Sequence, residues 1–215
     1  MDDMIHHCRA VARGAQRALI VCDMPFMSYE TSVEEALRNA GRLLKEGRAN
    51  AVKLEGGAEV CPQVKAITDA GIPVMGHLGL TPQSVNALGG YKVQGKSDSA
   101  AQKLLDDARA LEAAGAFAVV LECVPAPLAT LVTSRLSIPT IGIGAGSGTD
   151  GQILVYQDML GMTSGHTPRF ARRFADVGNE MRRGFSDYID SVRTGSFPSP
   201  DESFAGDENV ASKLS

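Results

Sequence analysis

Short apolar runs alternate with longer amphipathic segments along most of this chain. Runs that are apolar at successive positions are typical of strands buried on both faces, whereas apolar residues spaced three and four apart are typical of amphipathic helices. Strands are predicted at 18–23, 51–55, 72–77, 117–122 and 138–146, with a short strand or a helical turn at 151–155. Helices are predicted at 4–14, 31–46, 58–70, 99–115 and 125–136, with one or two basic amphipathic helices at 167–194.

The alternation of strand and helix predicts a parallel sheet covered by helices. An open doubly wound sheet and a (β/α)8 barrel both fit this order. We favour the barrel because many strands end in polar residues, and the carboxyl ends of the strands form the active site of a TIM barrel. A closed barrel of this type has eight strands, whereas the sequence supplies five or six. The expected fold is therefore α/β, a TIM-type barrel that is N-terminally incomplete, with about six of eight strands and a C-terminal helical extension.

Length and composition set the domain organisation. With 215 residues, 44% of them hydrophobic, the chain is long enough for one domain with a sizeable core. We assign 1–195 to a partial barrel that includes the C-terminal helices. The segment 196–215 is polar and poor in bulky apolar residues, so a loose tail is expected there.

Local signals mark a long loop and two helix starts. The segment 78–97 has no clear period, and loops of this length are usually functional lids or disordered segments. Its glycines and Tyr91 favour a lid. Capping-box patterns predict that Thr31 with Glu34, and Ser99 with Gln102, begin two of the helices.

Charge and cysteine content narrow the partners and the compartment. The net charge of -4 and the lack of a basic run give no sign of a nucleic-acid partner or an anionic membrane. No apolar run reaches transmembrane length. The four cysteines have neither CxxC nor zinc spacing, and Cys22 and Cys123 lie in apolar runs, which suits buried, reduced thiols. A cytoplasmic protein is expected.

Polar side chains end several predicted strands, namely Asp23, Lys53, Glu55, His77 and Glu122. Lys53 and Glu55 point to one face because side chains alternate along a strand. Carboxylates that meet on one rim repel unless a cation or proton lies between them, and Mg²⁺ prefers a few carboxylate oxygens plus waters and substrate oxygens. Asp23 and Glu55 are therefore candidate metal ligands. Glu122 could serve as a general base, and Lys53 could hold an anionic substrate or a developing oxyanion.

Structural roles are open for each of these residues taken alone. A strand-end acid can cap the next helix, and His77 could be an acid, a ligand, a hydrogen-bond donor or a satisfied structural histidine. Five such residues on consecutive strands are harder to explain as caps. The glycine-rich segment 142–146 does not have the phase of a dinucleotide-binding loop, and it indicates close backbone approach to a ligand or to packing.

Seven segments of the sequence together resemble the ketopantoate hydroxymethyltransferase (3-methyl-2-oxobutanoate hydroxymethyltransferase) family. They are DMPF at 23–26, VKLEGG at 52–57, GHLGLTPQS at 76–84, GGYKVQG at 89–95, LECVP at 121–125, IGIGAG at 141–146 and DGQILV at 150–155. Motifs of this length in this order are very specific, and the likeness extends to about residue 204.

The resemblance implies a (β/α)8 barrel and the first step of pantothenate biosynthesis. It implies transfer of a hydroxymethyl group from 5,10-methylenetetrahydrofolate to 3-methyl-2-oxobutanoate with Mg²⁺, giving 2-dehydropantoate. Carried over by position, Asp23 and Glu55 match metal ligands, Asp23, Lys53 and His77 match substrate-binding positions, and Glu122 matches the proton acceptor. The family is also similar in forming a homodecamer of two pentameric rings.

The sequence departs from the family at its start. The family has a further N-terminal stretch that carries two strands and a Gly-Asp-Ser segment, whose Asp binds the metal and whose Ser binds the substrate, and no residues here match it. Two hypotheses follow. One is an active transferase, either because the true chain is longer or because something else completes the barrel. The other is a truncated, inactive or regulatory paralogue that keeps the pocket half and the oligomer surface.

Overall fold

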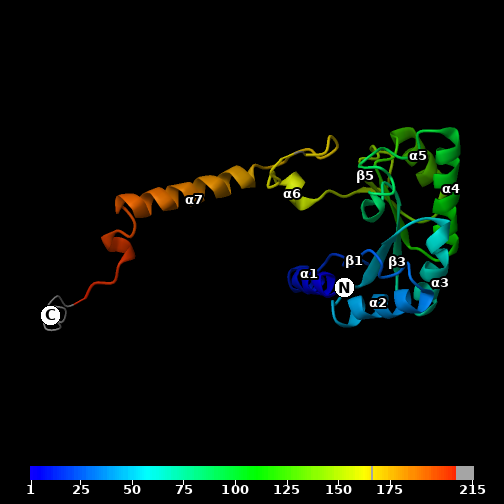
Figure 1. Cartoon of the computed structure of the whole chain (residues 1–215), viewed down its shortest axis with the longest axis horizontal. Helices are drawn as coiled ribbons and strands as arrows, with labels where there is room; N and C mark the ends of the chain where they lie inside the picture. Colours follow the sequence, from blue (N-terminus) through cyan, green and yellow to red (C-terminus); the bar gives the residue numbers. More distant parts are fainter. Residues whose placement is uncertain (166, 207–215) are drawn as a thin grey trace. The chain divides into compact units, whose positions relative to one another are not determined.

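The computed structural model describes residues 1–165 and 167–206. Its regular elements follow one another as strand and helix through most of the chain (Figure 1). The strands are β1 (Val21–Asp23), β2 (Ala51–Glu55), β3 (Val74–Gly79), β4 (Ala118–Glu122), β5 (Thr140–Ile143) and β6 (Gly151–Gln152). The α-helices are α1 (Asp2–Gly14), α2 (Val33–Lys45), α3 (Cys61–Asp69), α4 (Asp98–Ala113), α5 (Ala126–Arg135), α6 (Tyr156–Met159) and α7 (Val177–Thr194). Short 3-10 helices are η1 (Ala58–Val60), η2 (Pro82–Ser84) and η3 (Pro200–Glu202).

The six strands form one parallel sheet in the order β1-β2-β3-β4-β5-β6. Each of α2 to α5 lies between two successive strands of the sheet, and these helices lie along one side of it (Figure 1). This arrangement confirms the predicted α/β fold, a TIM-type half-barrel of six strands. The register sets Asp23 opposite Lys53, Glu55 opposite His77 and Gly79 opposite Glu122. The polar strand ends therefore meet at one edge.

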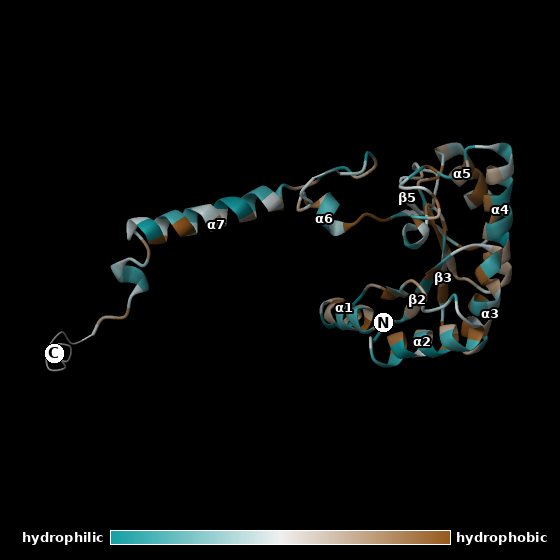
Figure 2. Cartoon of the chain, viewed as in Figure 1, coloured by the Kyte–Doolittle hydropathy of each residue, from teal (hydrophilic) through white to brown (hydrophobic). Residues whose placement is uncertain are grey.

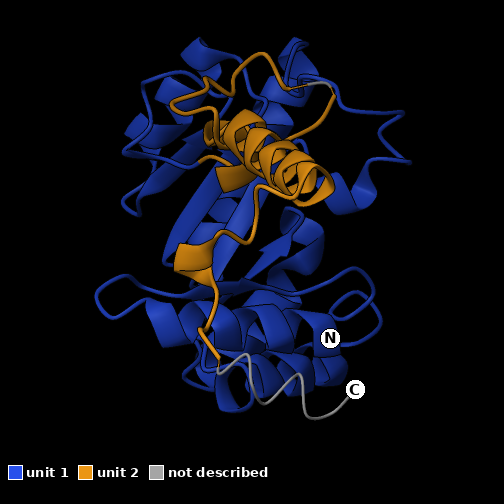
Figure 3. Ribbon diagram, turned by 90° about the vertical axis from the view of Figure 1, so that its left-hand side faces the viewer, with its two compact units in different colours: residues 1–153 blue, residues 154–215 orange. Residues whose placement is uncertain are grey.

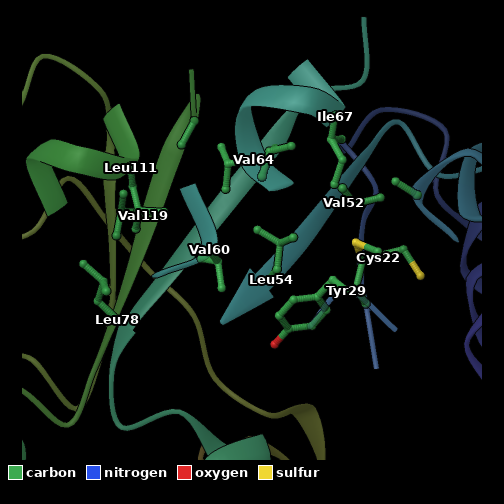
Figure 4. Packing of buried hydrophobic residues seen from close by; sticks show 14 of the residues in the cluster. Cys22, Tyr29, Val52, Leu54, Val60, Val64, Ile67, Leu78, Leu111 and Val119 are labelled. Atoms are coloured by element: carbon green, nitrogen blue, oxygen red, sulfur yellow. The ribbon is translucent and has the colours of Figure 1, made fainter. Parts of the chain in front are cut away.

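The hydrophobic core lies between the sheet and its helices (Figure 4). The strand period turns Val52 and Leu54 toward the helices, and both side chains are fully buried. Burying a side chain such as Leu54 contributes roughly 1.5–3 kcal/mol. At Gly76 of β3, an added Cβ would lie 2.7 Å from Leu111 Cδ1, so this glycine lets α4 pack closely on the sheet.

The two predicted helix starts are wrong by one or two residues. Ser32 is the N-cap of α2 and accepts a hydrogen bond from Glu35 N at 3.1 Å, and Ser97 is the N-cap of α4 and accepts from Ala100 N at 3.2 Å. Each start offers two neighbouring hydroxyl residues. The residue that caps is the one at which the backbone enters the helix, and side-chain spacing does not fix that position.

Other differences are at element ends. β1 is shorter than predicted because it pairs with β2 over only three residues. α6 escaped prediction because four residues are too few to show a helical period. Cys22 is buried as expected, whereas Cys123 follows β4, is half-buried and has a φ of 48°. All four cysteines are free.

The chain divides into two compact units, Met1–Ile153 and Leu154–Ser215 (Figure 3). In the second unit, one helix, α7, lies in the segment 167–194, where one or two helices were predicted. It begins at Val177, ten residues later than predicted, and ends before Gly195, which has the left-handed conformation. Its apolar residues are exposed and interspersed with polar ones (Figure 2); they are Met181, Phe185, Tyr188, Ile189 and Val192.

The predicted domain bounds of 1–195 and 196–215 stay predictions, and residues 207–215 of the tail lie outside the described residues. None of the helices in the described part of the chain is long and apolar enough to cross a membrane.

Candidate active site

The five predicted site residues come together at the carboxyl edge of the sheet. Asp23 ends β1, Lys53 and Glu55 share one face of β2, His77 lies near the end of β3, and Glu122 ends β4. Lys53 Nζ lies 3.3 Å from Asp23 Oδ2 and 3.0 Å from His77 Nδ1. On the other side of the ring, His77 Nε2 lies 3.1 Å from Glu122 Oε2. One line of contacts therefore runs across four neighbouring strands.

The lysine determines where the imidazole proton lies. An ammonium group only donates hydrogen bonds, so the Nδ1 atom that Lys53 contacts is the unprotonated nitrogen of His77. The neutral ring then carries its proton on Nε2, the atom that faces Glu122. This N–H is close to the carboxylate but is not aligned for a hydrogen bond, and Nε2 is buried without another partner among the described residues. The contact is therefore electrostatic, with the ring proton close to Glu122.

Glu55 is the most buried carboxylate of the site, with 6% of its side chain exposed. Its Oε2 accepts a hydrogen bond from Gln83 N at 3.0 Å, whereas Oε1 lies 3.8 Å from His77 Nδ1 and accepts no hydrogen bond from the described residues. Desolvation raises the pKa of Glu55, and the nearby His77, the Gln83 N–H and Lys53 offset only part of this rise. A cation at Oε1 would relieve the cost of burying this charge.

The three carboxylates have unequal access to solvent. The side chain of Asp23 is 47% exposed, that of Glu122 is 13% exposed, and Glu55 is nearly enclosed. Lys53, with 12% of its side chain exposed, lies between Asp23 and His77. The site therefore has an open carboxylate at one end, a shielded carboxylate at the other and a cation between them.

The donor chemistry at β1 and β2 fits a hard divalent cation. No group of three or more His, Cys, Asp or Glu side chains is assembled for a metal among residues 1–165 and 167–206. Mg²⁺, however, is commonly bound by one or two carboxylates and completes its shell with waters and substrate oxygens. Asp23 is accessible and Glu55 has one oxygen free, so these two residues could hold an ion whose other ligands come from water and substrate.

Tyr29 and Gln83 also contribute to the site, and the sequence did not predict this role for either of them. The hydroxyl of Tyr29 donates to Gln83 Oε1 at 3.0 Å and accepts from Glu55 N at 3.2 Å. Gln83 Nε2 donates to Met24 O at 2.9 Å. Gln83 lies in the segment without a period, and its only signal was a place inside the motif at 76–84. Residues that act through contacts between distant segments leave no periodic trace in a sequence.

A cavity of about 400 Å³ borders Glu55. It lies between the ends of β2 and β3, the segment that follows β3, and the first turns of α4, and its lining combines apolar and charged side chains. Among them are Leu78, Leu88, Leu104, Glu59 and Lys103. This volume is within the range of about 300–1,000 Å³ that small-molecule pockets occupy. The site therefore has room beside Glu55 for a ligand with both apolar and polar parts.

Known proteins resemble this chain over its whole length. A family model described as ketopantoate hydroxymethyltransferase matches residues 1–200. The 3-methyl-2-oxobutanoate hydroxymethyltransferase of Clostridium novyi (strain NT) is 64% identical over 214 residues, which cover 100% of this chain and 78% of the relative. The protein of the same name from Enterococcus faecalis (strain ATCC 700802 / V583) is 61% identical with the same coverage.

Among solved structures, a protein of Burkholderia cenocepacia J2315 described as a phosphonomutase superposes with a TM-score of 0.52. The match covers 90% of this chain and 77% of that chain at 14% identity. At this identity the likeness shows the fold alone, and it agrees with the TIM-type arrangement of the sheet.

Proposed function

This chain belongs to the ketopantoate hydroxymethyltransferase family, and from that membership we propose that it transfers a hydroxymethyl group from 5,10-methylenetetrahydrofolate to 3-methyl-2-oxobutanoate, giving 2-dehydropantoate. The observation that carries the proposal is the contact line from Asp23 through Lys53 and His77 to Glu122, with Glu55 beside it. It offers a place for an anionic oxo acid next to a cation and a carboxylate base.

In this proposal Lys53 binds the oxo acid. Its ammonium group is mostly enclosed, so its attraction for the substrate carboxylate and 2-oxo oxygen is weakly screened. Asp23 and Glu55 would hold Mg²⁺. When bound there, the ion supplies Lewis-acid polarisation of the 2-oxo group, which acidifies the neighbouring C3–H bond.

Glu122 is the proposed base. Its carboxylate takes the proton from C3 of the oxo acid, and the electron pair left at C3 forms the new bond to the methylene carbon of the folate. The bonds from that carbon to both folate nitrogens, N5 and N10, break, and each nitrogen gains a proton. One of these protons balances the proton taken from C3 and the other comes from water, whose remaining hydroxyl group is bonded to the transferred carbon. His77 supports this role, since its Nε2, which carries the proton of the neutral ring, lies 3.1 Å from Glu122 Oε2.

The cavity beside Glu55 supports a second, larger substrate. Its apolar side chains would cover the faces of a ring system, and its charged residues would meet polar edges. We place the ring system of the folate there, with its one-carbon unit directed toward the oxo acid. The homodecamer implied by the resemblance and the cytoplasmic location expected from the cysteine pattern stay predictions, and sedimentation analysis of the purified protein would test the assembly.

Proton exchange at C3 of the oxo acid tests the assignment of Glu122. Incubating the protein with 3-methyl-2-oxobutanoate and Mg²⁺ in D₂O, without folate, isolates this step, and ¹H NMR follows the loss of the C3 proton. We expect Glu122→Gln to lose exchange by at least about 100-fold, the scale of general-base catalysis. Glu34→Gln, on the exposed face of α2, is the matched control and should keep wild-type exchange. Exchange at the wild-type rate in Glu122→Gln would remove Glu122 as the base.

A further inference from the structure

We propose that Gln83 is a positioning residue that holds the Glu55 carboxylate in the orientation needed to bind a divalent cation. The inference rests on the proposed metal site, and it assigns a role to a residue outside the strands. Gln83 belongs to η2, in the segment that follows β3, whereas Glu55 ends β2.

Three polar groups of Gln83 bind three different parts of the site. Its backbone N–H donates to Glu55 Oε2 at 3.0 Å. Its side-chain Nε2 donates to Met24 O at 2.9 Å, directly after β1, and its Oε1 accepts from Tyr29 Oη at 3.0 Å. The side chain thus fixes the backbone that carries the N–H. Gln83 thereby connects the ends of β1 and β2, which carry the proposed ligands Asp23 and Glu55, to the segment that follows β3.

The bond from Gln83 gives the two oxygens of Glu55 different roles. A hydrogen bond to a carboxylate favours its charged form and fixes the plane of the group. Because Oε2 is held by the Gln83 N–H, Oε1 is the oxygen that remains free of hydrogen bonds from the described residues. In a side chain that is 6% exposed, few waters could replace this bond. Glu55 Oε1, the oxygen without a hydrogen bond, is then held in one orientation and can face a cation.

Tyr29 holds Gln83 and the backbone of Glu55 in place from the hydrophobic core. Its ring is 1% exposed and belongs to the same buried cluster as Leu54 (Figure 4). Its hydroxyl has one proton, which it donates to Gln83 Oε1, and a lone pair accepts from Glu55 N at 3.2 Å. The packed ring therefore orients both Gln83 and the backbone of Glu55.

This geometry requires an amide at position 83. Glutamine is a donor to Met24 O and an acceptor from Tyr29 in one planar group, whereas glutamate lacks the donor and leucine lacks both. Partners of this kind, which orient metal ligands without touching the metal, typically change metal affinity about 10–100-fold when they are mutated.

Titration with Mn²⁺ alone, followed by EPR, tests the proposal without any need for turnover. We expect wild-type protein to bind Mn²⁺ and Gln83→Leu to raise the Kd by about 10–100-fold. Gln63→Ala is the matched control, because Gln63 donates to the backbone oxygen of Tyr29 and not to its hydroxyl. It should keep the Kd within about twofold, and circular dichroism of each variant should show the same folded fraction.

A double-mutant cycle separates positioning from general damage. In a Glu55→Gln background, Gln83→Leu should cause little further loss of Mn²⁺ affinity, because the residue acts through Glu55. Equal and additive losses in both backgrounds would overturn the proposal. If Gln83→Leu does not fold, Tyr29→Phe takes its place, since it removes only the hydroxyl; an unchanged Kd in that variant would also overturn the positioning role.

The same titration shows whether the proposed metal site or only the positioning role of Gln83 has failed. If wild-type protein does not bind Mn²⁺, the proposed metal site fails and the role of Gln83 fails with it. If wild-type protein binds Mn²⁺ and Gln83→Leu binds it equally well, only the positioning role is lost, and the metal site stands.

Discussion

The ammonium nitrogen of Lys53 lies 3.0 Å from Nδ1 of His77, on the neighbouring strand. This contact makes a neutral His77 carry its proton on Nε2, toward Glu122. The lysine therefore serves two groups at once, since it also contacts Asp23 at 3.3 Å. Removing it should affect chemistry at both ends of the site.

We expect Lys53→Met to lose C3 proton exchange by about 100- to 1,000-fold, the scale found when a donor to a developing oxyanion is removed. The loss has two sources. The oxo acid loses its cation, and the His77 proton is free to move to Nδ1, away from Glu122. Exchange in D₂O with Mg²⁺, followed by NMR, measures the effect.

Metal affinity shows whether Lys53→Met loses exchange through the missing lysine or through damage to the proposed metal site. Lys53 competes for Asp23, so Mn²⁺ binding by Lys53→Met should be as tight as in wild type or tighter. The matched control is Lys65→Met, which removes an exposed lysine paired with Asp69 on α3 and should leave both measurements unchanged. Wild-type exchange in Lys53→Met would exclude the proposed role.

The sequence was sufficient to predict the strand-end residues of the site. Polar residues that interrupt apolar runs are visible in a sequence, and the two-residue period of a strand places Lys53 and Glu55 on one face. Because the strands are parallel, their carboxyl ends meet at one edge, and the structure brings Asp23, His77 and Glu122 there as well. The fold was predictable for the same reason, since strand and helix periods alternate.

Contacts between distant segments were not predictable in this way. Tyr29 and Gln83 are 54 residues apart, and neither lies in an element with a period that would reveal its partner. The exact cap was also ambiguous at the start of α2, where Thr31 and Ser32 are both good N-cap residues. Such choices depend on where the backbone turns into the helix.

The cap at α2 gives a direct stability test. We expect Ser32→Ala to lower the free energy of unfolding by about 1 kcal/mol, because it removes the acceptor for Glu35 N. Thr31→Ala should have a smaller effect, since the hydrogen bond that the Thr31 hydroxyl donates within the described part of the chain goes to the exposed Glu35 side chain. Urea denaturation followed by circular dichroism measures both. A larger loss for Thr31→Ala would return the cap to the position that the sequence pattern indicated.

The backbone of Gly79 lies close to that of Glu122, the proposed base. It has a φ of 90°, and an added Cβ would lie 2.2 Å from the backbone oxygen of Glu122. Since neither backbone can yield easily, we expect Gly79→Ala to destabilise the fold by about 3 kcal/mol or more and to reduce C3 proton exchange.

Gly41 provides the opposite case on the same fold. It lies inside α2, and an added Cβ would meet nothing within 4 Å. Gly41→Ala should therefore stabilise the protein by about 0.5–1 kcal/mol through helix propensity, without changing exchange. Thermal unfolding of both variants checks the pair, and equal effects at the two glycines would contradict the close approach at Gly79.

The loop between α5 and β5 should make stability depend on pH through Glu112. One carboxylate oxygen, Oε1, accepts from Ser137 Oγ at 2.6 Å, from Ser137 N at 2.7 Å and from Ile138 N at 3.2 Å. The hydrogen bonds from the Ser137 side chain and backbone lower the pKa of Glu112. A carboxyl group whose pKa is depressed by folding stabilises the protein above the unfolded pKa, about 4.3, and this contribution is lost as pH falls through the folded pKa.

We therefore expect Glu112→Gln to reduce the free energy of unfolding at pH 7 by about 1 kcal/mol, a modest figure because the group is partly exposed to solvent. The difference from wild type should shrink as pH falls from about 4.3 through the lower pKa of the folded state, where wild-type Glu112 becomes neutral as well. Urea denaturation at pH 7, 5, 4 and 3 measures it. Glu34→Gln, on an exposed helical face, should show no such trend. A Glu112→Gln deficit that stays constant across these pH values would show that the charge of Glu112 does not hold this loop.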